Sequence, residues 1–258
     1  DAGLSGGGLN IMGLSILDSV DILYNSGGSG GAINFNYGRG EINNSRISHN
    51  ECSYNSPGLA VTGSNWGFGD LIDSPGLILN HVEITDNSPG DNQVLIISSV
   101  DGWSVNRVEL NNVTIVADPE LPGLLSGIRI EGAIANTLDI HNSIIGAFPS
   151  GGIYTDGVED LSIDYSNIAE GESSITINPE NLTYENNIDE DPQFVDVLDD
   201  NYNLLASSPC IDTGDPLSEL DPDDTRADIG AWYYDQNDNP IAWGCLDPLA
   251  SNYEEASE

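Results

Sequence analysis

Short runs of alternating apolar and polar residues recur along the chain, and each run contains a closing isoleucine. The first three runs are LDSVDILYN at 17–25, INNSRISHN at 42–50 and LNHVEITDN at 79–87. Three more are LNNVTI at 110–115, IHNSII at 140–145 and IDYSNI at 163–168. Their closing isoleucines lie 25, 37, 31, 30 and 23 residues apart, at Ile22, Ile47, Ile84, Ile115, Ile145 and Ile168. An uneven period in the twenties to thirties predicts a stack of structural repeats.

A second apolar run precedes each of these phrases. These runs are GLNIMG at 8–13, AINFN at 32–36, GLAVTG at 58–63, QVLIIS at 93–98, GIRIEG at 127–132, GIYTDG at 152–157 and SITIN at 174–178. Alternation with a period of two, β-branched residues and flanking turn residues predict strands, and no helical periodicity of useful length occurs. We therefore expect an all-β fold with at least two short strands per repeat. One repeat cannot bury its own apolar face, so neighbouring repeats share a core.

An asparagine ends each of the first three phrases, at Asn25, Asn50 and Asn87. Asparagine tolerates the left-handed backbone of a tight turn. Stacked asparagine side chains can also hydrogen-bond from one repeat to the next. Both interpretations give these residues a structural role.

Repeats of this kind resemble the right-handed parallel β-helix of the pectate-lyase-like superfamily, over about residues 8–190. The resemblance implies a solenoid domain over residues 1–190, whose N-terminal coils are expected to be missing because the chain begins in repeat-like sequence. The superfamily contains lyases, hydrolases, epimerases, tailspikes and adhesins, so the fold does not decide the chemistry.

The character of the sequence changes near residue 190. DPQFVDVLDDNYNLLASSPCIDTGDP at 191–216, followed by RADIGAWYY at 226–234, resembles the closing segment of secreted bacterial β-helix proteins. We expect residues 191–240 to form a C-terminal cap, because the end of a solenoid exposes unpaired strand edges. Its predicted apolar contacts are Phe194, Tyr202, Leu204, Ile211, Ile229 and Trp232.

Residues 241–258 are predicted to be a partial surface module or linker. GCLDPLASNYEEASE at 244–258 resembles a Gly-Cys-x-Asp-Pro-x-Ala-x-Asn-Tyr module of surface proteins from marine Bacteroidetes and relatives. This resemblance implies secretion to the cell surface. The module usually ends in a second cysteine, which is missing here. Cys52, Cys210 and Cys245 therefore fit either one disulfide with a remaining thiol or three thiols.

The chain carries 5 Lys plus Arg against 43 Asp plus Glu, a formal net charge of −38. Nucleic acid and anionic membrane surfaces are excluded as partners, because both bind through cationic side chains. No apolar run is long enough for a transmembrane helix. Self-repulsion of this size favours a medium containing salt or Ca²⁺.

The strand runs ahead of each phrase predict an inner and an outer face. Leu59, Val94 and Ile128 are expected to point inward. The expected outer residues are Asn34, Asn36, Leu95, Arg129, Glu131, Tyr154 and Asp156. Enzymes that resemble this fold commonly bind substrate along this outer face.

The outer patch of Arg129, Glu131, Tyr154 and Asp156 is the candidate site for chemistry. Strand spacing would place the carboxylates of Glu131 and Asp156 roughly 5 Å apart. Such a pair suits a retaining glycosidase, a calcium ion or an exposed ion cluster without a function. The chain has no lysine, and RIEG at 129–132 carries Glu131 where polygalacturonases carry a lysine. These departures favour a non-catalytic interpretation.

Two further segments are candidates for binding. Trp66 and Phe68, in the glycine-rich insertion at 63–76, can stack on a sugar or pack against the repeats. Clustered acidic residues make a calcium site conceivable at the C-terminal end: Asp221, Asp223, Asp224, Asp235 and Asp238.

We therefore expect a secreted, extracellular β-helix module that is structural, adhesive or glycan-binding. Its expected partners are a polysaccharide or cell-surface glycan, further copies of itself, or neighbouring domains of a longer chain. The only expected cofactor is Ca²⁺. The alternative is a polysaccharide-active hydrolase or lyase that uses Glu131 and Asp156.

Overall fold

The computed structural model describes residues 7–11, 13–28, 31–36, 39–52, 56–62, 76–87, 93–98, 107–117, 126–131, 135–148, 151–156, 158–176 and 179–237. Within these ranges the regular structure is β, apart from two short 3-10 helices, η1 (Gly171–Ser174) and η2 (Val197–Asp199). Neither described helix is long and apolar enough to cross a membrane. The prediction of an all-β fold is confirmed.

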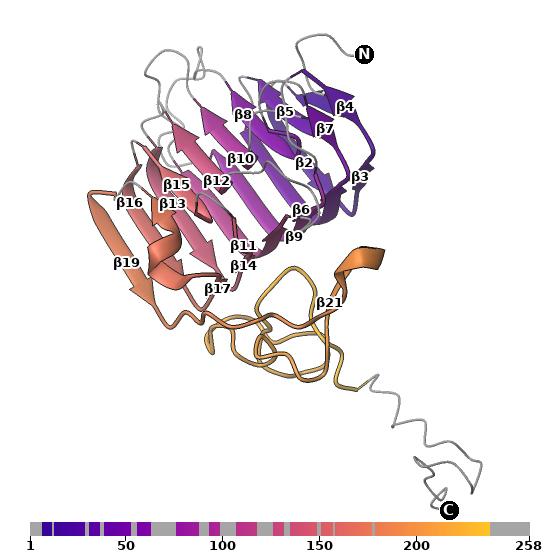
Figure 1. The fold of residues 1–258 in the computed structure, drawn as a ribbon, viewed down its shortest axis with the longest axis vertical. Coiled ribbons are helices and arrows are strands. Elements are labelled where there is room, and N and C mark those ends of the chain that lie inside the picture. Colours follow the sequence, from indigo (N-terminus) through magenta and orange to yellow (C-terminus); the bar gives the residue numbers. More distant parts are fainter. Residues whose placement is uncertain are drawn as a thin grey trace, which may run out of the picture.

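Two long parallel sheets form the body of the molecule (Figure 1). The seven-stranded sheet contains β1 (Leu9–Ile11), β5 (Ile33–Asn36), β8 (Leu59–Thr62), β10 (Gln93–Ser98), β12 (Ser126–Glu131), β15 (Ile153–Thr155) and β18 (Ile175–Thr176). The main path of the ten-stranded sheet contains β2 (Leu14–Asp18), β6 (Arg39–Ser48), β9 (Leu77–Thr85), β11 (Arg107–Val116), β13 (Ala135–His141), β16 (Val158–Asp164) and β19 (Asn181–Glu185). Off this path lie β3 (Asp21–Leu23), β14 (Ile144–Ile145) and β17 (Asn167–Ile168).

Two small sheets complete the regular structure of the described residues. β4 (Ser26–Gly27) pairs in parallel with β7 (Glu51–Cys52). β20 (Phe194–Asp196) pairs antiparallel with β21 (Asn201–Leu204).

The chain visits the two large sheets alternately, and each strand pairs with its counterpart from the next repeat. In register, Ile22 pairs with Ile47, and Ile47 pairs with Ile84. The pairing continues through Ile115 to Ile145 and Ile168. These isoleucines belong to one continuous buried cluster between the sheets. The predicted column of recurring isoleucines is therefore confirmed.

The inward-facing residues of β10 differ from the prediction. Leu95 pairs with Leu59 and Ile128, and all three are fully buried. The prediction that Leu95 faces outward is therefore wrong. Val94 is also buried, as expected. The period-two pattern could not fix the register of QVLIIS, because four consecutive residues in it are apolar.

The predicted asparagine ladder is confirmed, although its backbone conformation differs from the prediction. Asn25 Nδ2 donates to Asn50 Oδ1 at 3.0 Å, and Asn50 Nδ2 donates to Asn87 Oδ1 at 2.9 Å. The left-handed residues are instead those directly before the ladder, namely Tyr24, His49 and Asp86. A second left-handed row lies at the bend of each phrase, at Ser19, Asn44, His81, Asn112, Asn142 and Tyr165, and continues at Asn186 after β19.

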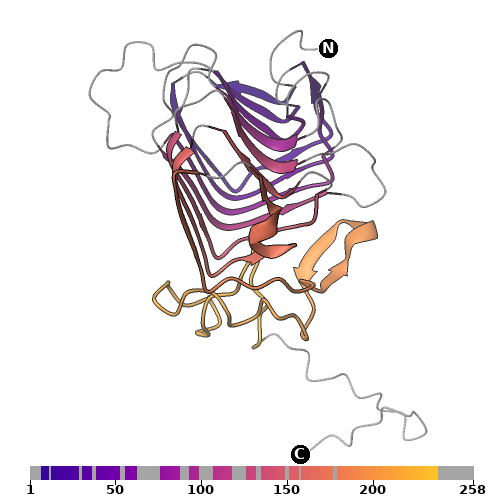
Figure 2. The same ribbon diagram turned by 60° about the vertical axis from the view of Figure 1, so that its left-hand side comes forward.

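The segment 191–237 packs along one flank of the ten-stranded sheet, returning from the last repeat towards the first (Figures 1 and 2). After its left-handed bend, each phrase from the second onward presents one outward residue, and these residues form a column: Arg46, Glu83, Thr114, Ile144 and Asn167. Each contacts the segment. Arg46 donates to the Asp200 carbonyl, Glu83 accepts from Trp232, and Thr114 accepts from Ala231. Asn167 Nδ2 donates to Cys210 Sγ.

Four of the six predicted apolar contact residues of this segment, Phe194, Leu204, Ile211 and Ile229, lie in one cluster on the flank. Leu204, Cys210 and Ile229 form a buried cluster with the outward-facing Ile144, and Phe194 and Ile211 pack against it. The contacts with Ile144 place this part of the segment on a flank of the ten-stranded sheet, and a cap over the last strands stays a prediction. An apolar outward residue in the middle of the stack, Ile144, provides the core on which the segment folds.

Candidate functional site

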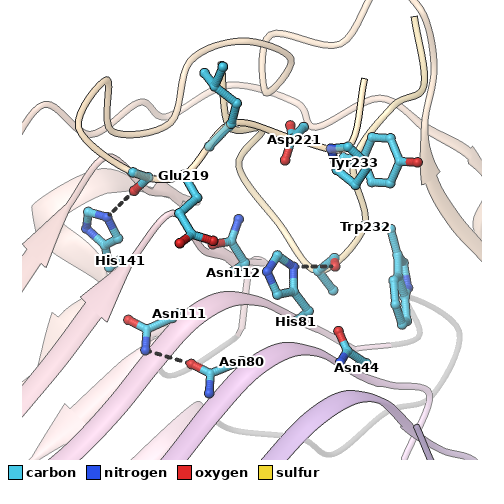
Figure 3. Close-up of a pocket in the computed structure, with 15 residues that line it drawn as sticks. Asn44, Asn80, His81, Asn111, Asn112, His141, Glu219, Asp221, Trp232 and Tyr233 are labelled. Carbon is cyan, nitrogen blue, oxygen red and sulfur yellow. Dashed lines mark hydrogen bonds between the residues drawn. The ribbon is translucent and has the colours of Figure 1, made fainter. Parts of the chain in front are cut away.

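A cavity of about 600 Å³ lies between the outer face of the ten-stranded sheet and the segment 218–233 (Figure 3). This volume lies within the range of small-molecule sites. Its lining consists of Asn44, Asn80, His81, Asn111, Asn112, His141, Ser218, Glu219, Leu220, Asp221, Pro222, Ala227, Ala231, Trp232 and Tyr233.

The floor is a row of side-chain amides from consecutive strands. Asn43, Asn80 and Asn111 are paired in register on β6, β9 and β11. Asn80 Nδ2 donates to Asn43 Oδ1 at 2.8 Å, and Asn111 Nδ2 donates to Asn80 Oδ1 at 2.9 Å. Each ladder bond uses one of the two amide hydrogens of its donor, so the row retains capacity to donate to a ligand.

His141 continues the row on β13 and helps to hold the loop above the cavity. It pairs in register with Asn111. Its Nδ1 lies 2.7 Å from Asp164 Oδ1, and its Nε2 lies 3.2 Å from Ser218 Oγ. Asn142 adds two bonds to the same loop, from its Nδ2 to Ser218 Oγ and from the Asp215 amide to its Oδ1. The loop is thereby fixed over the floor.

Trp232 forms an aromatic wall. Its indole Nε1 donates to Glu83 Oε2 at 2.7 Å, and Glu83 Oε1 lies 2.8 Å from Arg46 Nε. This ion pair therefore sets the orientation of the ring. Gly230 makes the close approach feasible, because its φ is +118° and an added Cβ would lie 2.8 Å from Ile144 Cδ1.

His81 stands beside the wall. Its Nδ1 lies 3.3 Å from the Ala231 carbonyl oxygen, which can only accept, so Nδ1 carries the proton in this contact. Desolvation lowers the pKa of His81 below its ordinary 6.5, and the bond to the carbonyl opposes that change. His81 is therefore neutral at pH 7 and its Nε2 is an acceptor.

Two acidic residues also line the cavity, Glu219 and Asp221. Glu219 extends towards Asn112 (Figure 3). Burial raises the pKa of Asp221 to about 6, and nearby Asp223 and Asp212 act in the same direction. None of the fifteen lining residues is Lys or Arg. The cavity thus combines amides, an aromatic ring and carboxylates without a cationic side chain.

The patch predicted on the other sheet is assembled in part. The Arg129 guanidinium lies over the Tyr154 ring at 4.2 Å, and the two residues pair in register. Glu131 ends β12, and the exposed Asp156 follows β15. The Asp156 amide donates to the Ile130 carbonyl. The backbones of Glu131 and Asp156 therefore lie on neighbouring strands, while the Glu131 side chain is outside what the structure describes.

The other predicted ligand-binding residues are distributed differently. Asn34 pairs with Ala60 in the expected column, but it is only 4% exposed. Asn34 therefore lies in the predicted outer column, but other parts of the chain cover it. Asn36 is placed in β5 through its backbone alone. Trp66 and Phe68 lie outside the described residues.

The predicted calcium residues bind backbone amides of their own segment. Asp221 accepts from the Asp228 amide, Asp223 accepts from the Thr225 and Gln236 amides, and Asp235 accepts from the Asn237 amide. Asp224 is exposed, and Asp238 lies outside the described residues. These hydrogen bonds explain why carboxylates occur at these positions in the loops. Calcium binding stays a prediction.

Two of the three cysteines are described. Cys52 and Cys210 are buried thiols that are not bonded to each other. Burial raises the pKa of Cys210 to about 11, although Asn167 Nδ2 donates to its sulfur at 3.2 Å. A disulfide between Cys52 and Cys210 is therefore absent, and the two remaining alternatives are three thiols and a pairing through Cys245.

Sequence reasoning missed this cavity. One signal was available: three consecutive phrases carry asparagine directly after their first apolar residue, at Asn43, Asn80 and Asn111. The contribution of Trp232 carried no comparable signal, because it depends on how the C-terminal segment folds back. Comparison of the chain with protein-family models, curated proteins and solved structures gave no match.

Proposed function

We propose that this chain is a right-handed parallel β-helix module, of the pectate-lyase-like kind, that is secreted and binds a neutral glycan in the cavity beside Trp232. The alternating visits to two parallel sheets and the isoleucine column support the solenoid. The glycan is inferred from the cavity, in which a row of amides faces an aromatic wall.

The chemistry of the cavity favours a neutral sugar. Sugar hydroxyls both donate and accept, as the amides of Asn80 and Asn111 do. The aromatic wall provides an apolar face on which a sugar ring can stack. Anionic polysaccharides are disfavoured, because Glu219 and the net charge of −38 would repel them.

The first test compares two binding-site variants with the parent protein. We expect Trp232→Ala to weaken binding of a neutral oligosaccharide about tenfold or more, because truncating a central aromatic typically costs about 2 kcal/mol. Asn111→Ala should weaken it by a smaller factor. Neutral and acidic oligosaccharides are screened on an array, and hits are measured by isothermal titration calorimetry.

Tyr154→Ala, on the other sheet, is the matched control. Its affinity for the glycan should equal that of the parent. If Tyr154→Ala lost binding while Trp232→Ala and Asn111→Ala kept it, the patch at Arg129 would be the glycan site and the cavity would not. Circular dichroism verifies that each variant is folded.

A polysaccharide-active enzyme is the second candidate function. The register that puts the backbones of Glu131 and Asp156 on neighbouring strands supports it. Incubating the parent with neutral and acidic polysaccharides and measuring released ends tests for turnover. Turnover that Glu131→Gln and Asp156→Asn both abolish would establish the enzyme and replace the purely binding role.

The first strands support a place in a larger assembly. β2 lies at one end of the ten-stranded sheet, and its outward residues Leu14 and Ile16 are 81% and 64% exposed. Exposed apolar side chains beside a sheet end are suited to contact with a neighbouring domain or with a second copy. Sedimentation velocity over a range of concentrations distinguishes self-association from a monomer.

A further inference from the structure

Three metal-ligating side chains meet where the C-terminal segment crosses the first repeats. The ligand atoms of His49, Asp86 and Asp200 all lie within 4.8 Å of one another. His49 and Asp86 occupy equivalent left-handed positions in consecutive phrases, directly before the asparagine ladder. Asp200 lies between η2 and β21. The cluster therefore joins the body of the sheets to the segment on its flank.

The separation of the two accessible ligands suits a tetrahedral ion. His49 Nε2 lies 3.4 Å from Asp200 Oδ1. Two ligands at about 2.1 Å from a zinc ion, at the tetrahedral angle, are about 3.4 Å apart. A carboxylate oxygen of Asp86 lies within 4.8 Å of both ligand atoms and provides the third protein ligand.

Partners outside the cluster hold two of its members. Ser48 Oγ lies 2.6 Å from His49 Nδ1, which leaves Nε2 directed at the two carboxylates. Tyr202 Oη donates to Asp86 Oδ1 at 2.5 Å. Metal-binding histidines and carboxylates usually have such outer hydrogen bonds, which fix their orientation.

The local charges and exposure also suit a divalent cation. Asp86 is 5% exposed, whereas the His49 and Asp200 side chains are 29% and 38% exposed and leave an entry path. Arg46 pairs with Glu83 and donates to the Asp200 backbone carbonyl. Its charge is therefore directed at Glu83.

We infer that His49, Asp86 and Asp200 form a binding site for a divalent first-row transition metal such as Zn²⁺, which fastens the C-terminal segment to the first repeats. One imidazole nitrogen and two carboxylate oxygens suit zinc. Calcium prefers six to eight oxygen ligands and is disfavoured here. Water can complete the coordination on the exposed side. The inference does not depend on glycan binding.

The test uses the full chain after treatment with EDTA and dialysis. Titration with ZnCl₂ should show one saturable site by calorimetry that His49→Gln and Asp200→Asn each remove. At a free Zn²⁺ concentration near one hundred times Kd, the Tm of the parent should rise by about 5 °C or more. The two variants should show no such shift. Co²⁺ should give the visible absorption bands of a tetrahedral site in the parent alone.

His81→Gln is the matched histidine control, because His81 also has a left-handed backbone, in the other left-handed row, and lies outside the cluster. It should bind Zn²⁺ as the parent does. Limited proteolysis supplies a readout of the clamp itself: Zn²⁺ should slow cleavage within 191–237 in the parent and in His81→Gln. Absence of saturable binding by the parent, or undiminished binding by both cluster variants, would overturn the inference.

Discussion

The C-terminal segment contains two buried carboxyl groups with raised pKa values, Asp221 and Asp228. Burial raises the pKa of Asp228 to about 6, and Asp221 close by is raised to a similar value. Asp228 is 2% exposed and accepts the amides of Asp212 and Tyr234 through its two oxygens. Asp228 thus joins the backbone at Asp212 to the backbone at Tyr234. Burying its carboxylate costs more free energy when the group is charged than when it is protonated.

The sign of the pH dependence follows from this elevation. Below about pH 4 both the folded and the unfolded chain hold these protons, and the full contribution to stability is present. Between about pH 4 and pH 6 the folded state binds more protons than the unfolded state. The contribution of Asp221 and Asp228 to the free energy of unfolding is therefore lost as the pH rises through about 6.

Asp228→Asn should reduce this loss. We expect the free energy of unfolding, measured by urea denaturation from about pH 4 to pH 7, to fall less with pH in the variant than in the parent. Equal slopes in the two proteins would contradict the assignment. Repeating the series with millimolar Ca²⁺ tests the predicted calcium site, since a cation bound at Asp221 would reduce the slope of the parent.

The repeated element is a phrase with two hydrogen-bonded asparagine rows of different burial. The inner row runs through Asn50, which is fully buried and bonds to Asn25, Asn87 and two backbone carbonyls. The outer row at Asn80 is half-buried and borders the cavity. Water can replace the bonds of the outer row but cannot reach those of the inner row.

Asn50→Ala should destabilise the protein much more than Asn80→Ala. Removing the Asn50 amide leaves buried partners unsatisfied, and we expect a loss of about 3 kcal/mol. The loss for Asn80→Ala should stay below about 1 kcal/mol, because water satisfies its partners. Guanidinium unfolding of both variants measures the difference, and losses of equal size would show that the two rows do not differ in this way.

At the scale of the whole molecule, self-repulsion at a net charge of −38 opposes the folding that the core drives. The ion pairs given by the described residues offset little of this repulsion, because basic side chains are few. Screening should therefore stabilise the folded chain. A divalent metal at His49 would act in the same direction, but locally.

Raising NaCl from about 10 mM to about 0.5 M should raise Tm by a few °C, because the Debye length falls from about 30 Å to a few ångströms. The experiment is done in EDTA, so that metal binding does not contribute. An equal concentration of a neutral solute serves as control. A Tm that stays constant or falls with salt would show that self-repulsion does not limit stability.

The sequence alone determined which residues face the core in most repeats, and hence the two parallel sheets. The isoleucines from Ile22 to Ile168 recur once per repeat, and they can be buried only if the repeats stack. The asparagine that forms the ladder at Asn50 belongs to the same repeated phrase. This pattern is short and recurs along the chain, so it can be recognised from one sequence without any relatives. Where the pattern was degenerate, as in the apolar run around Leu95, the register was misjudged.

Tertiary structure alone decided where the C-terminal segment lies, and with it both candidate sites. Trp232 lines the same cavity as Asn80, and Asp200 lies beside His49, only because the segment folds back along a flank on the apolar surface around Ile144. These contacts join positions about 150 residues apart, and none repeats along the chain. Packing that repeats along the chain produces a periodic sequence pattern, which a single sequence can show. A contact that occurs once produces no periodic pattern and cannot be predicted in this way.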